Sequence, residues 1–103
     1  MNDSEFAQLT DDAFARLEQG LENADLDFEL PADGILEVEF DDGSKLVINR
    51  HNVAREIWVA ARSGGFHFRH DGDAWKDTRD GAELFAKLAA LIESQGGGTV
   101  SFG

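Results

Sequence analysis

The chain of 103 residues contains no cysteine, no tyrosine, a single proline and only nine basic residues. Without cysteine the protein can form no disulfide, no zinc-thiolate site, no thiol nucleophile and no iron-sulfur cluster held by its own thiolates. The nine lysines and arginines stand against 21 acidic residues, so the formal net charge is −12. Nucleic-acid backbones and anionic membranes both require basic residues, so this charge excludes them as partners and favours cationic ones.

Long apolar runs are missing as well. The longest extend over five residues, as at 57–61, which is far too short to cross a bilayer. The first residues are acidic and polar, whereas a targeting peptide carries basic residues. Because 42% of the residues are hydrophobic and 29% are charged, we expect one compact cytoplasmic domain over residues 1–103.

The motifs of common enzymes are also missing. The sequence contains no Gly-x-Ser-x-Gly elbow and no phosphate-binding loop, and the segment at 71–73 lacks the spacing of a calcium-binding loop. The three histidines, His51, His67 and His70, belong to a predicted loop and a predicted strand. This spread indicates surface imidazoles and not a metal-binding cluster. We therefore expect a protein that is not an enzyme.

The negative charge is concentrated in the first two-fifths of the chain. Residues 1–43 hold 14 acidic residues and one basic residue, Arg16, whereas residues 44–103 hold seven acidic and eight basic residues. Apolar residues recur through this segment at steps of three and four, which predicts an amphipathic helix from Ser4 to Ala24. On a helical wheel four carboxylates share one side, which we call the acidic ridge: Asp11, Glu18, Glu22 and Asp25. Such a ridge can bind a cation or a basic protein, or it can be an ordinary solvated helix face.

Beyond this helix the apolar periodicity changes to two, which is typical of strands. Turn signals separate about six strands, predicted at 25–30, 35–40, 45–50, 56–61, 66–70 and 75–77. A capping box of Asp80 and Glu83 then predicts a second helix that ends at Gly96. Short connections make neighbouring strands antiparallel. The predicted fold class is therefore α+β, a two-layer sandwich with the N- and C-terminal helices on one face of an antiparallel sheet.

The other face of the predicted sheet is open to water. If Ile57 and Val59 point toward the helices, the alternation of a strand places Trp58 on the open face, with Asn49 beside it on the neighbouring strand. An exposed tryptophan is typical of protein interfaces, although neighbouring side chains can also cover it. We assign the second tryptophan, Trp75, to the core.

Several segments of the chain resemble the bacterial frataxins and follow one another in the same order. They are MNDSEF at 1–6, GSK at 43–45 with INR at 48–50, EIWVA at 56–60, GGFHF at 64–68 and TVSF at 99–102. The resemblance covers nearly the whole chain and implies the frataxin fold, in agreement with the architecture inferred from periodicity. The chain departs from the family at His51 and Val53, where glutamine and proline are usual, and this departure concerns the rigidity of the loop.

The resemblance further implies iron binding and a role in iron-sulfur cluster assembly, through contact with the cysteine desulfurase and the scaffold protein. The implied metal-binding residues are Asp3, Asp11, Glu18, Glu22, Asp25, Asp27, Glu29 and Asp41. The implied partner-binding residues are Asn49, Trp58, Glu18 and Glu22. A ridge without a preformed cage should bind Fe2+ or Fe3+ weakly, because water fills the open coordination positions. We expect no organic cofactor, and a monomer that iron can assemble into an oligomer.

A second hypothesis, of a different class, also assigns the function to the acidic ridge but gives metal binding no functional role. In this hypothesis the ridge docks on a basic protein surface, either as an acidic interaction module or as a mimic of DNA phosphates. The exposed tryptophan and the resemblance to frataxins both favour the first function over a DNA mimic.

Overall fold

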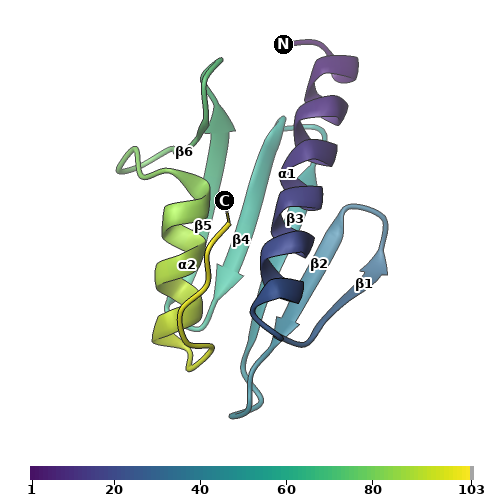
Figure 1. The fold of residues 1–103 in the computed structure, drawn as a ribbon. Helices are drawn as coiled ribbons and strands as arrows, with labels where there is room; N and C mark the ends of the chain where they lie inside the picture. The colour runs from purple at the N-terminus through teal and green to yellow at the C-terminus, as the bar shows by residue number, and fades with distance from the viewer. Residues whose placement is uncertain (103) are drawn as a thin grey trace.

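The structure is a computed structural model that describes residues 1–102, and it contains two helices and one six-stranded sheet (Figure 1). The helices are α1 (Asp3–Asn23) and α2 (Leu84–Ser94). The strands are β1 (Phe28–Ala32), β2 (Ile35–Glu39), β3 (Lys45–His51), β4 (Glu56–Ala61), β5 (Gly64–His70) and β6 (Trp75–Asp77). The strands lie side by side in chain order, each antiparallel to the next. The predicted α+β two-layer sandwich is confirmed.

The core lies between the two helices and one face of the sheet. α1 begins with a capping box, because Asn2 accepts a hydrogen bond from the backbone N–H of Glu5 and Glu5 accepts one from Asn2 in return. Alternate strand residues face the helices, as the period of two predicts. Core residues with exposed fractions of 2% or less include Leu17, Leu21, Leu36, Val38, Leu46, Ile48, Ile57, Val59, Phe68, Leu84, Leu88 and Ile92. Trp75 is also buried, as expected.

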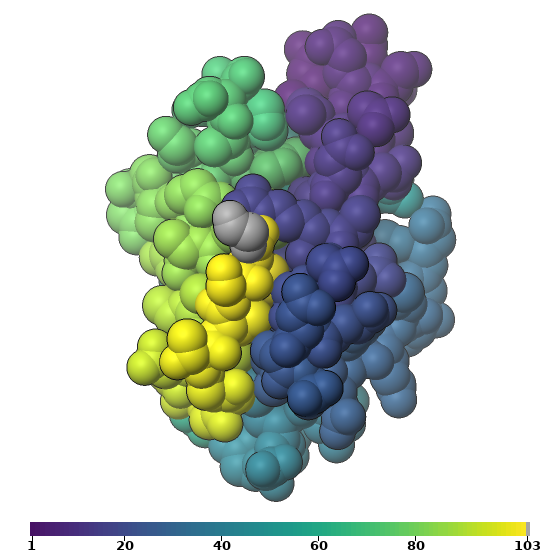
Figure 2. Space-filling model, viewed as in Figure 1, coloured from purple at the N-terminus to yellow at the C-terminus, as the bar shows by residue number. Residues whose placement is uncertain are grey.

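The segment after α2 closes the core between the two helices (Figures 1 and 2). Val100 and Phe102 are buried there. The approach to α1 is close: a Cβ atom placed on Gly20 would clash with the Phe102 ring, so any larger residue would have to displace this ring. Arg16 also donates a hydrogen bond to the Phe102 carbonyl. The segment is therefore part of the packed domain.

The first strand differs from the prediction. β1 covers Phe28–Ala32 instead of 25–30 and includes Pro31. Asp25 interrupts the extended backbone with a φ of 56°, which delays the start of the strand. Pro31 is tolerated because β1 is an edge strand, and its pairing with β2 shifts register between Glu29 and Ala32. The shift leaves Leu30 51% exposed.

The start of α2 also differs from the prediction. Glu83 is the N-cap itself, since its carboxylate accepts hydrogen bonds from the backbone N–H groups of Phe85 and Ala86. Asp80 forms no capping box with it; instead it accepts from the Ala82 N–H and pairs with Lys87 at 2.9 Å. A local Asp-x-x-Glu pattern does not say which of its two carboxylates reaches the helix end.

Candidate functional site

The acidic ridge runs along the flank of α1 that faces β1. Glu18 and Glu22 are one helical turn apart, which is a rise of about 6 Å, and Asp11 lies two turns before Glu18. Glu22 and Asp25 are exposed, whereas Glu18 is half-buried. The left-handed conformation of Asp25 turns the chain from α1 toward β1. The ridge predicted from the helical wheel therefore ends where the chain turns toward β1.

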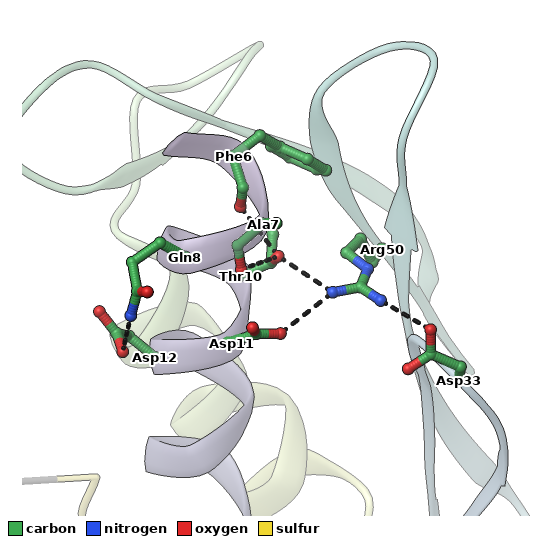
Figure 3. A network of polar contacts seen from close by, with 8 residues as sticks. All are labelled: Phe6, Ala7, Gln8, Thr10, Asp11, Asp12, Asp33 and Arg50. Carbon is green, nitrogen blue, oxygen red and sulfur yellow. Dashed lines mark hydrogen bonds and ion pairs between the residues drawn. The ribbon is translucent and has the colours of Figure 1, made fainter. Parts of the chain in front are cut away.

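Two of the eight predicted metal-binding carboxylates already have a cation of the protein beside them. Arg50 Nη1 lies 3.1 Å from Asp11 Oδ1, and Arg50 Nη2 lies 3.0 Å from Asp33 Oδ2 (Figure 3). Arg55 Nη2 lies 2.7 Å from an oxygen of Asp3. The neighbouring guanidinium weakens the attraction of Asp11 and Asp3 for a further cation, although both carboxylates stay exposed, at 69% and 93%.

The other six predicted carboxylates take part in no ion pair within residues 1–102. They are Glu18, Glu22, Asp25, Asp27, Glu29 and Asp41. We call this set the unpaired carboxylates. It contains the part of the predicted site that remains able to attract an external cation.

Three of the unpaired carboxylates lie together in an acidic hollow on β1 and β2. Asp27, Glu29 and Asp41 line this open hollow of about 520 Å³ together with Glu37 and Glu39. Glu29 stands directly opposite Glu37 across the two strands, an arrangement that destabilises a sheet through repulsion. Lys45 also lines the hollow and lies 3.5 Å from Glu37 Oε1, so it relieves part of this repulsion. A bound cation would relieve the remainder.

Glu37 and Glu39 were not among the residues predicted for the site. Their part in it depends on the register in which β1 pairs with β2, which residue types alone do not give. In the described part of the chain, no three or more His, Cys, Asp or Glu side chains are close enough to hold one ion together. The structure therefore presents two groups of carboxylates, on the α1 flank and in the hollow, and no single preformed cage.

The open face of the sheet carries a stack of three rings. Asn49 and Trp58 pair directly across β3 and β4, as predicted. Trp58 is only half-exposed, because His51 stacks on one face of the indole at 3.8 Å between ring centroids and His67 on the other at 4.4 Å. Sequence analysis missed this arrangement, since the two histidines come from different strands and His51 was assigned to a loop.

Glu56 fixes the edge of this stack. Its side chain is only 7% exposed, and Oε1 accepts a hydrogen bond of 2.9 Å from Trp58 Nε1 while Oε2 accepts one from Arg69. Burial alone raises the pKa of Glu56, but the hydrogen bonds from Trp58 and Arg69 and the charge of Arg69 outweigh burial and lower this pKa. Glu56 is therefore a buried anion on the face of the sheet that was expected to be solvated.

Residues 1–98 match the family model of the frataxin-like domain. This chain belongs to the frataxin family. It is 59% identical to the "Iron-sulfur cluster assembly protein CyaY" of Dechloromonas aromatica over 94% of each chain. It is 48% identical to the protein of that name from Chromobacterium violaceum, over 99% of this chain and 98% of the relative.

Solved frataxin structures share the fold. The frataxin from Psychromonas ingrahamii superposes with a TM-score of 0.92 at 35% identity, covering 100% of this chain and 99% of its own. The trimeric frataxin from Saccharomyces cerevisiae, complexed with ferrous iron, superposes with a TM-score of 0.73 at 26% identity and covers 84% of this chain and 83% of its own. The resemblance stated from the sequence is confirmed.

In this frataxin the departure from the family pattern has a structural consequence. His51 continues β3 and stacks on Trp58, and its Nδ1 accepts a hydrogen bond of 3.1 Å from the Ala54 N–H. This bond closes the turn between β3 and β4, which contains Val53, a side chain that is 94% exposed. His51 therefore restrains this turn. No helix among residues 1–102 has the length and apolar character needed to span a bilayer.

Proposed function

We propose that this frataxin acts in iron-sulfur cluster assembly, binding iron as cargo through its unpaired carboxylates and contacting the cysteine desulfurase and the scaffold protein. The names of its relatives and the ferrous complex of the yeast frataxin support the proposal. The single observation that carries it is the division of the predicted residues: six acidic side chains near α1 and β1 lack an internal counter-ion within residues 1–102.

The chemistry of these groups suits iron. Carboxylate oxygens are donors for hard and borderline cations, and exposed groups can move to coordinate an ion. Because no cage is preformed among residues 1–102, each ion keeps several water ligands and affinity stays weak. Weak binding fits a protein that passes iron on or senses it. The yeast frataxin is trimeric in its ferrous complex, and we infer that iron bridging carboxylates of two copies can also assemble this chain from monomers.

The proposed protein contacts use two surfaces. Glu18 and Glu22 meet a basic surface, and their charge accelerates encounter. Asn49 and the three-ring stack around Trp58 form a flat aromatic contact on the open sheet face, which supplies short-range energy.

Two variants separate these surfaces. Reversing Glu18 and Glu22 to lysine should weaken both cation binding and partner binding, whereas Trp58→Ala should spare cation binding and weaken partner binding. Cation binding is measured by nuclear magnetic resonance titration with diamagnetic La3+, and partner binding by recovery of the desulfurase from extract. Reversal of Asp73 and Glu93, both exposed and outside the proposed site, makes the same change in net charge and serves as the control.

The outcomes that contradict the proposal are specific. Amide signals that shift evenly along the chain, or an equal loss of La3+ binding in the Trp58→Ala variant, would contradict the assignment of cation binding to α1 and β1. Recovery of DNA-binding proteins in place of the desulfurase would favour a DNA mimic.

A further inference from the structure

A groove of about 410 Å³ lies between α1 and the edge strand β1. Its floor is apolar and is formed by Phe14 and Ala15 of α1 and by Leu30 of β1. Its rim carries carboxylates from Asp11 and Glu18 on α1 and from Asp33 in the turn after β1. An apolar floor within an acidic rim differs from the purely acidic surface that the sequence predicts.

Leu30 is an exception among the residues that face the helices. The inward-facing residues that pair across the next strands, Leu36, Ile48 and Val59, are at most 2% exposed, whereas Leu30 is 51% exposed. The register shift of β1 carries it away from the core, so the groove remains open beside Phe14, which is itself only partly buried.

The charges at the rim favour an incoming cation. Arg50 lies at the groove with its guanidinium already paired to Asp11 and Asp33 (Figure 3). Glu18 has no ion pair within residues 1–102, and Glu22 follows one turn later. The groove therefore has unmatched negative charge next to exposed apolar surface.

The edge strand β1 is poorly suited to pair with a β-strand of a partner protein. Pro31 has no N–H to offer, and the shift between Glu29 and Ala32 breaks the regular ladder. An occupant therefore gains little from backbone pairing and must bind through its side chains.

We propose that the groove between α1 and β1 binds a basic segment of the partner protein, with one of its apolar side chains packed on Leu30 and Phe14 and an adjacent lysine or arginine paired with Glu18. The inference rests on the proposed function, because the segment belongs to the partner whose basic surface meets Glu18 and Glu22. It adds a second source of short-range energy, Leu30 on the helix side, to the contact that Trp58 makes on the opposite face of the sheet.

The test compares two exposed aliphatic residues. Leu30→Ser removes the apolar floor, and Val53→Ser changes a side chain that is 94% exposed and lies outside the groove. The affinity of each full-length variant for the purified cysteine desulfurase is measured by calorimetry. Loss of one buried leucine contact should weaken binding about tenfold for Leu30→Ser, while Val53→Ser binds as the wild type does. La3+ titration and melting temperature should change little in either variant, which separates the groove from the cation site and from folding.

Each other result overturns the inference. Wild-type affinity in Leu30→Ser, with the Glu18 and Glu22 reversal still harmful, overturns the groove alone and leaves the proposed function standing. An equal loss of affinity for the desulfurase in both serine variants shows that replacing any exposed aliphatic residue weakens binding, and it likewise rejects the groove as the binding site. Absence of any binding by the wild type rejects the proposed partner and the groove together.

Discussion

Arg50 is the internal counter-ion of the acidic ridge. Replacing it with methionine tests how its positive charge affects folding stability and cation binding. Its side chain is 16% exposed and joins α1 to the turn after β1 through two contacts of 3.1 and 3.0 Å. The carboxylates of Asp11 and Asp33 are 69% and 96% exposed, so water screens both pairs. Together with the packed stem of Arg50, the pairs are worth about 1 kcal/mol of folding free energy. For a domain of this size that loss lowers Tm by about 4–8 °C.

Cation binding should change in the opposite direction. Arg50→Met frees Asp11 and removes a positive charge that repels any ion on the α1 flank. For an ion held at Glu18, about 12 Å away along the helix, this repulsion in a water-like dielectric costs about 0.3 kcal/mol per unit of ion charge, or about 1 kcal/mol for La3+. We therefore expect the affinity for La3+ to rise about fivefold or more while the protein becomes less stable.

The control for this experiment is Arg62→Met. Arg62 pairs with Asp42 at 2.6 Å, outside the predicted metal-binding residues, and its loss makes the same change in net charge. Thermal unfolding and La3+ titration are measured for both variants. A fivefold gain in both would mean that only total charge matters, and an unchanged affinity in Arg50→Met would remove Asp11 from the cation-binding surface.

Two further predictions concern charge. Glu56→Gln should destabilise the fold by about 1 kcal/mol at neutral pH. Because the folded-state pKa of Glu56 is lowered from 4.5, the stabilisation is present above that value and is lost as the pH falls through the folded-state pKa. Urea unfolding of both proteins at neutral and at acidic pH checks this, and a difference that does not depend on pH would contradict it. Millimolar divalent cations or added salt should raise Tm by relieving repulsion within residues 1–43; a Tm that responds to neither would show that the carboxylates are too dispersed to repel one another.

Local periodicity was sufficient for much of the fold. The limits of β4 and β6 agree with the prediction, α1 differs by one residue at each end, and Trp75 is buried as expected. These features depend on residues within a few positions of one another. The misplaced capping box at Asp80 and the delayed start of β1 are also local, but they depend on backbone angles that residue types alone do not determine.

The candidate site was harder to predict because its contacts are distant in sequence. Arg50 reaches Asp11 across 39 residues, and this contact removes Asp11 from the unpaired carboxylates. Similarly, His51 and His67 meet on Trp58 only because three strands pair in one particular register. The sequence was enough to identify the acidic residues and Trp58 as candidates. The counter-ions of the carboxylates and the rings that pack on Trp58 depend on how the sheet assembles.

The packing of Val100 and Phe102 against Gly20 has a consequence for biosynthesis. α1 emerges from the ribosome before the sheet, carrying acidic residues that repel one another, and its apolar face lacks a full set of partners until residue 102 is synthesised. Folding of this domain is therefore completed after synthesis of the sheet and both helices, and a nascent chain arrested before residue 100 exposes the apolar side of α1 to chaperones.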